Sequence, residues 1–173
     1  MTTATTLTAE RADLLETLAA HRHFLRHTVQ RLTDEQARQR TTASELTLGG
    51  LVKHVAAQEA GWVRFVVEGP EAMATPTDEA GFQAWAEEFV LRPGETLEGV
   101  LTEYAQVAER TDELVRTIPD LDAAHPLPKA PWFEAGAVRS ARRVFLHIVA
   151  ETAQHAGHAD ILRESLDGQK TMA

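Results

Sequence analysis

The stretch HIVAETAQHAGHAD, residues 147–160, places three histidines, one glutamate and one aspartate among residues that otherwise resemble the interior of a helix. Successive residues of an α-helix are about 100° apart, so side chains four positions apart lie one turn from each other on one face. Glu151 and His155 have this spacing and project side by side, as do the paired ligands of helical zinc and di-iron sites. The stretch therefore indicates binding of a divalent metal ion.

The apolar residues around this pair predict that both side chains point into the protein. On a helical wheel, Glu151 and His155 fall within the core-facing stripe. That stripe is marked by Val144, Ile148, Ala159 and Leu162. A carboxylate in apolar surroundings is costly unless it is paired or bound to a metal ion, so Glu151 needs a partner.

His54, in the segment LVKHVAAQEAGW, is the best candidate for a third ligand from a facing helix. It shares a flank with Leu51 and Phe65, near the apolar face of its own helix. Together with Glu151 and His155 it would complete a set of two imidazoles and one carboxylate. The alternative, on spacing alone, is that the two residues of the last helix form a hydrogen-bonded core pair and that His54 is a satisfied helix histidine.

Two further histidines lie at the edge of the same stripe. We expect His147 and His158 to have a structural role or to support a ligand, rather than to bind the metal directly. His158 follows His155 by three residues, which is close enough to orient a ligand or to move a proton. We therefore take His158 as the candidate catalytic residue.

The remaining candidates carry weaker signals. We expect His23 and His27 on the solvent face of the first helix, and His21 on its core side. For His125, in a proline-rich segment, a mobile site residue and an incidental residue are equally credible. The wheel turns Glu59 toward the apolar face, where we expect it to form hydrogen bonds. The aromatic residues expected to pack the core are Trp62, Trp85 and Phe145.

Four segments repeat apolar residues at helical spacing and predict an all-α four-helix bundle. They cover about residues 8–32, 48–68, 96–118 and 138–166. No segment shows the alternation of a strand, and helix-forming residues dominate. A short helical turn is expected after Thr33, and a short helix over residues 82–90.

Two long connections join these helices. Residues 69–95 are long enough to cross the bundle, which would make the second and third helices parallel neighbours. Residues 119–140 contain four prolines, which we expect to prevent regular structure. Trp132 and Phe133 argue against a free linker in that segment. We therefore predict a packed cover over one end of the bundle, which would control access of a substrate.

Composition excludes several classes of protein. The length of 173 residues predicts a single domain over residues 1–173, and the absence of cysteine excludes disulfides, cysteine nucleophiles and thiolate metal sites. The net charge of −9 has the wrong sign for binding nucleic acid. With no signal peptide and no membrane-spanning segment in the sequence, we expect a cytoplasmic protein that does not bind membranes.

Two segments together resemble a known superfamily. LTLGGLVKHVAAQEAGW and LHIVAETAQHAGHADILRESLDG are similar to the DinB-like metal-binding four-helix bundles, in the branch related to mycothiol-dependent maleylpyruvate isomerase and to mycothiol and bacillithiol S-transferases. The resemblance implies a bundle with a long crossover between helices two and three. Many members bind a divalent metal through three histidines, whereas the isomerase branch has a His-Glu-His set. The resemblance thus implies His54, Glu151 and His155 as ligands.

The resemblance also implies an activity. The isomerase has a second, C-terminal domain that this sequence does not show, so we expect the activity of the single-domain relatives. These join a low-molecular-weight thiol, such as mycothiol, to an electrophilic small molecule. A divalent metal, which we expect to be zinc, would deprotonate the thiol. The alternative is a non-catalytic metal- or ligand-binding bundle of a stress response; the sequence leaves a homodimer open in both cases.

Overall fold

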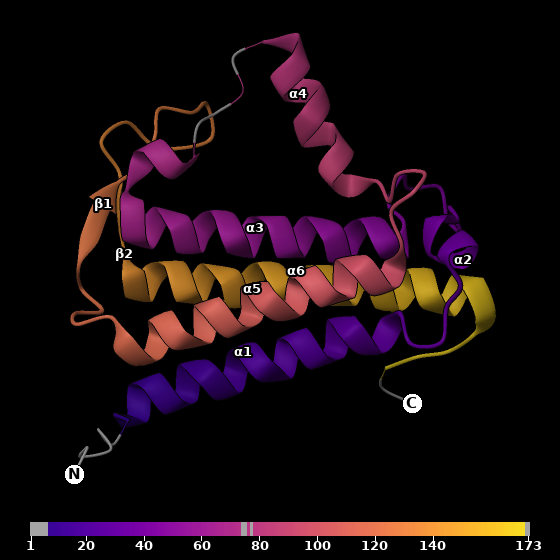
Figure 1. Ribbon diagram of the computed structural model, residues 1–173, viewed down its shortest axis with the longest axis horizontal. Helices are drawn as coiled ribbons and strands as arrows, with labels where there is room; N and C mark the ends of the chain where they lie inside the picture. Colours follow the sequence, from indigo (N-terminus) through magenta and orange to yellow (C-terminus); the bar gives the residue numbers. More distant parts are fainter. Residues whose placement is uncertain (1–6, 74–75, 77, 172–173) are drawn as a thin grey trace.

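A computed structural model, which describes residues 7–73, 76 and 78–171, confirms the all-α four-helix bundle. Its long helices are α1 (Ala9–Thr28), α3 (Leu48–Glu68), α5 (Leu97–Thr117) and α6 (Ala141–Asp167). They lie side by side, with α1 and α6 running in one direction and α3 and α5 in the other (Figure 1). Since α3 and α5 are packed, parallel neighbours, the predicted crossover between them is confirmed.

Each long helix begins at a residue whose side chain accepts a hydrogen bond from the backbone three positions later. These N-cap residues are Thr8, Thr47, Thr96 and Ser140. Such side chains satisfy one of the free N–H groups of a first turn. The end of α3 is as predicted, because Gly69 adopts φ 86° there, a conformation that glycine reaches without strain.

The first helix ends at Thr28, earlier than the predicted residue 32. Arg31 takes a positive φ of 62°, which turns the chain toward α2 (Asp34–Arg38). Thr33 begins α2 with a capping box, in which its side chain and that of Gln36 each bind the other's backbone N–H. The helical turn expected after Thr33 is therefore confirmed.

The crossover contains short helical elements. The chain passes from η1 (Pro70–Met73) to α4 (Glu79–Ala86) and η2 (Glu87–Phe89), and α4 stands away from the bundle above α3 (Figure 1). The helix predicted over residues 82–90 thus exists and begins earlier, because Asp78 caps it.

Two short strands correct the expectation that the proline-rich segment has no regular structure. β1 (Ala124–Pro126) pairs antiparallel with β2 (Val138–Ser140), so α6 begins at Ala141 instead of residue 138. Three-residue strands are too short to show a period of two. Pro126 is tolerated because a two-stranded ribbon consists of edge strands, on which a missing N–H is accommodated.

The buried residues confirm most of the expected core. The four apolar residues that mark the predicted stripe of α6 are buried, as are Trp62 and Phe145, whereas Glu151 and His155 are half-buried. Trp85 was expected in the core, but it is 43% exposed on α4. That expectation was wrong because α4 packs mainly against its own neighbours in the crossover. Among the described residues, no helix is long and apolar enough to span a membrane.

Candidate functional site

The structure brings His54 of α3 together with Glu151 and His155 of α6. One ligand atom from each of the three lies within 4.8 Å of the other two. The rings of His54 and His155 meet edge to face, with centroids 5.0 Å apart, and His155 Nε2 lies 3.5 Å from Glu151 Oε2. The i, i+4 spacing on α6 aligns one pair, and the packing of α3 against α6 supplies the third group.

The imidazole of His54 is buried, and one of its ring nitrogens has no hydrogen-bond partner. Its Nδ1 atom has no hydrogen bond to any residue that the structure describes. Burial, and after it the nearby His155, lower the pKa of His54 from 6.5 to about 4 against the opposing effect of Glu151. The ring is therefore neutral near pH 7, the form that binds a metal. A buried polar atom without a partner needs an explanation, and an ion shared with Glu151 and His155 fits it.

The carboxylate of Glu151 lies between two histidines. His155 lowers the pKa of this carboxyl, while partial burial acts in the opposite direction. Its other oxygen, Oε1, lies 3.7 Å from His147 Nε2. Glu151 thus offers a negative charge to an ion beside neutral His54, and this donor set suits a divalent transition metal.

His158 contacts a candidate ligand without joining the converging group. Its Nδ1 lies 3.4 Å from Nδ1 of His155. Nε2 of His155, on the other side of the ring, is the atom that faces Glu151. A contact of this kind orients a ligand and sets its tautomer. A proton-transfer role for His158 stays a prediction.

Phe89 covers one face of His54. Their rings are stacked, with centroids 3.8 Å apart and planes at 21°. This contact depends on Gly50, because a Cβ at that position would lie 1.9 Å from the backbone oxygen of Phe89. The sequence pattern did not reveal this contact, since it joins a crossover residue to a helix far away in the chain.

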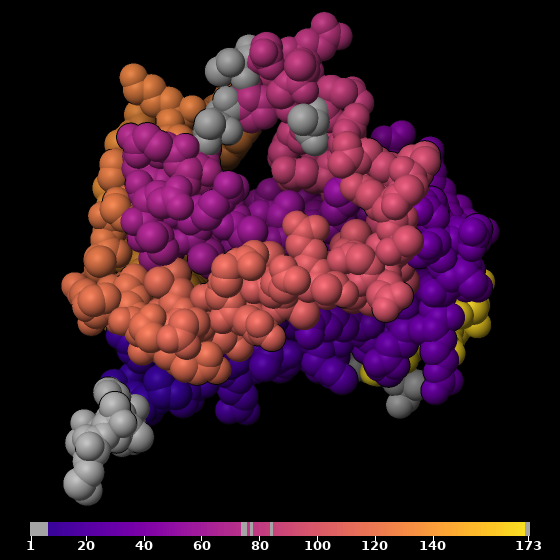
Figure 2. Space-filling view, viewed as in Figure 1, coloured from indigo at the N-terminus to yellow at the C-terminus, as the bar shows by residue number. Residues whose placement is uncertain are grey.

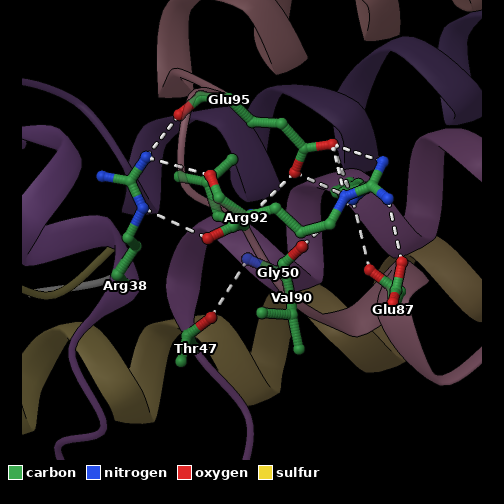
Figure 3. A network of polar contacts seen from close by, with 9 residues as sticks. Arg38, Thr47, Gly50, Glu87, Val90, Arg92 and Glu95 are labelled. Carbon is green, nitrogen blue, oxygen red and sulfur yellow. Dashed lines mark hydrogen bonds and ion pairs between the residues drawn. The ribbon is translucent and has the colours of Figure 1, made fainter.

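A polar network fixes the end of the crossover against α3 and α2 (Figure 3). Lys53 of α3 donates to both carboxylate oxygens of Glu95, at 2.9 Å each, and to the backbone oxygen of Val90 at 3.1 Å. Arg38 of α2 donates to the backbone oxygens of Leu91 and Arg92. The segment that carries Phe89 is therefore held by charged groups as well as by the approach at Gly50.

A pocket of about 370 Å³ opens beside Glu151, and His54 and His155 are not among the residues that line it. Glu151 and His147 line it, together with Glu88, whose Oε2 is buried with no hydrogen-bond partner among the described residues. Figure 2 shows the surface hollowed between α3 and α4. The proline-rich segment contributes Trp132 and Phe133, so it covers the side of α3 as well as reaching the end of the bundle. Sequence reasoning missed Glu88, which carries no periodic signal.

The other sequence candidates lie away from this pocket. Glu59 is buried and accepts hydrogen bonds from Arg22 and Thr111, as expected of an interior polar group. His125 packs edge to face on Phe65 without lining the pocket, which favours the incidental reading.

The first helix carries three of the predicted histidines. His23 is exposed as expected, whereas His21 and His27 are half-buried. His27 was expected on the solvent face, but it lines a small cleft with residues near the end of α6. The helical-wheel projection considers α1 alone, so it could not predict that residues after α6 would cover His27.

The comparisons with known proteins agree with the geometry. A sequence model of one protein family, described as Mycothiol-S-transferase, matches residues 13–168. The match spans all four long helices and includes His54, Glu151 and His155. No curated protein sequence matched the chain.

Proposed function

Because this chain belongs to the mycothiol S-transferase family, an enzyme family, we propose that it joins mycothiol, or a closely related low-molecular-weight thiol, to a small electrophile. We propose that His54, Glu151 and His155 hold a divalent ion, zinc, for this reaction. The observation that carries the proposal is the convergence of three ligand atoms beside a pocket. Structural zinc sites are usually closed by four protein ligands, whereas catalytic sites keep a position open.

The ion, Glu151 and His158 have separate roles in the proposed reaction. A divalent ion bound there supplies the Lewis acidity that lowers the pKa of a thiol. Glu151 contributes one negative charge, so the protein offsets only part of the ion's charge and thiolate formation stays favourable. His158 orients His155, and we assign to it the transfer of the thiol proton toward solvent.

The transfer itself is a displacement. The thiol sulfur forms a bond to the electrophilic carbon, the bond from that carbon to the leaving group breaks, and the leaving group departs with the electron pair. The proton of the thiol passes to solvent, so nothing is oxidised or reduced. Trp62 and Phe133 line the pocket and exclude water from the reacting carbon.

Metal analysis combined with a conjugation assay tests both parts of the proposal. We expect the purified protein to contain one zinc ion per chain and to accelerate conjugation of mycothiol with iodoacetamide, as followed by mass spectrometry. Glu151→Gln should lose both properties, while His125→Gln, away from the pocket, should keep both. Full metal content in Glu151→Gln would contradict the ligand assignment. A metal-loaded protein that accelerates conjugation of neither mycothiol nor bacillithiol would contradict the activity.

A further inference from the structure

Aromatic side chains form a continuous wall from Glu151 to the mouth of the pocket. The ring centroids of Trp62 and His147 are 4.7 Å apart, and His147 in turn contacts Glu151. Phe133 meets Trp62 edge to face, with centroids 6.4 Å apart. The rings of Phe133 and Trp132 also meet edge to face, with centroids 6.1 Å apart. A path bordered by aromatic rings therefore leads from the candidate ligand Glu151 to the surface, with the guanidinium of Arg139 over the rings of Trp62 and Phe133.

Two tryptophans at the outer part of the pocket are exposed. Trp85 is 43% and Trp132 is 58% exposed, although both line the pocket. Their rings come from separate elements and are parallel to within 10°, with centroids 6.3 Å apart. Large apolar side chains exposed together in a concave site indicate a binding surface.

Trp85 is also connected to the candidate metal site. The ring of Trp85 meets that of Phe89 edge to face, with centroids 6.5 Å apart, and Phe89 stacks on His54. The aromatic contacts thus continue from the pocket lining in two directions, through Phe133 to Trp62 and through Phe89, which does not itself line the pocket. A molecule bound in the pocket would meet the rings of Trp62, Trp85, Trp132 and Phe133.

From this arrangement we infer that the pocket selects a planar aromatic electrophile and that Trp85 and Trp132 are residues that determine this specificity. The inference rests on the proposed S-transfer and names its second substrate class. Aromatic rings attract each other in offset or edge-to-face contacts beyond the effect of buried area alone. The pocket volume of about 370 Å³ is at the lower end of small-molecule sites, which suits a substituted single ring.

For an aryl halide, the reaction is aromatic substitution. The thiol sulfur bonds to the ring carbon that carries the halogen, the carbon–halogen bond breaks, and halide leaves with its electron pair. The thiol proton passes to solvent. The aromatic wall places the ring carbon near Glu151, where the activated sulfur is proposed to lie.

Steady-state kinetics with two electrophiles test the inference on the metal-loaded protein with mycothiol. Chlorodinitrobenzene serves as the planar aryl electrophile, and iodoacetamide as a small, uncharged electrophile without a ring. In the double variant Trp85→Leu, Trp132→Leu, the ratio of kcat/KM for chlorodinitrobenzene to that for iodoacetamide should fall about tenfold, as expected for the loss of two aromatic contacts. An unchanged ratio would overturn the inference, because it would mean that the two tryptophans act only as a general cover.

A matched control and a binding measurement complete the test. Phe82→Leu removes another exposed aromatic ring of α4 that does not line the pocket, and it should leave the ratio unchanged. Calorimetric binding of dinitrobenzene, which has no leaving group, needs no turnover and should weaken about tenfold in the double variant. If the wild-type protein conjugates no thiol, the proposed function fails, while this binding arm still decides on aromatic recognition. Equal dinitrobenzene affinity in both proteins would overturn the inference.

Discussion

At the scale of single residues, the unpartnered nitrogen of His54 favours the proposed metal centre over a packed core pair. Glu151 and His155 do contact each other, as a hydrogen-bonded pair would. Such a pair leaves Nδ1 of buried His54 without explanation, and an unsatisfied buried group costs about 1–3 kcal/mol. The proposed ion, bound by the ring of His54 and by Glu151, would give this buried ring a partner and offset the negative charge of the carboxylate.

The contact between His158 and His155 leads to a prediction that tests whether His158 orients a metal ligand or binds the metal itself. His158→Ala should weaken zinc affinity by roughly tenfold, the effect of losing a group that orients a ligand. His155→Ala should abolish stoichiometric binding. Competition with a chromophoric chelator measures both affinities. Equal losses in the two variants would mean that His158 is itself a ligand, and a structural site with four ligands would then be favoured.

At the scale of elements, the approach of η2 to α3 depends on one glycine. In Gly50→Ala the new Cβ would collide with the backbone oxygen of Phe89, so η2 must move away from His54. We expect a loss of about 1–3 kcal/mol in the free energy of unfolding, measured with urea. Gly157→Ala, whose Cβ would meet nothing within 4 Å, should instead stabilise α6 by about 1 kcal/mol. Similar losses in both variants would contradict the close approach.

The network at the end of the crossover predicts a pH dependence. Burial raises the pKa of Glu95, but hydrogen bonds from Lys53 and Arg92 outweigh it and lower the pKa from 4.5 to about 2. The unfolded state therefore binds the proton first, so the stabilisation is present above about pH 4.5 and is lost toward pH 2. Glu95→Gln should be less stable than wild type at pH 7, by about 1.5 kcal/mol, and the gap should close as the pH falls. A gap that is constant from pH 7 to pH 3 in urea unfolding would contradict this.

The elements also show what the sequence could predict. The four long helices carry a local signal, namely helical periodicity, and their prediction was confirmed. β1 and β2 were missed because their pairing joins Ala124 to Ser140 across a loop and has no periodicity. Trp85 was misplaced because its exposure follows from how the crossover packs, which local pattern does not encode. The convergence of His54 with α6 was foreseen as a facing-helix contact, and its stacking on Phe89 was not.

At the scale of the whole molecule, the bundle and its connections have separate roles. The bundle supplies the candidate ligands, since His54, Glu151 and His155 all belong to long helices. The crossover and the proline-rich segment supply the outer pocket wall through Trp85 and Trp132. Changes in the connections should therefore alter electrophile selection more than metal binding.

The composition of the whole chain sets the kinetic scheme of the proposed reaction. With no cysteine in the sequence, the protein has no thiol of its own on which the electrophile could be held. We therefore predict that the thiol attacks the electrophile directly, with both substrates bound to the protein at the same time. Initial rates measured at several concentrations of mycothiol and iodoacetamide should give intersecting double-reciprocal lines. Incubation with iodoacetamide alone should leave no adduct that a later addition of mycothiol removes, as followed by the intact mass of the protein. Parallel lines with a transient adduct would indicate a covalent enzyme intermediate and would refute direct transfer.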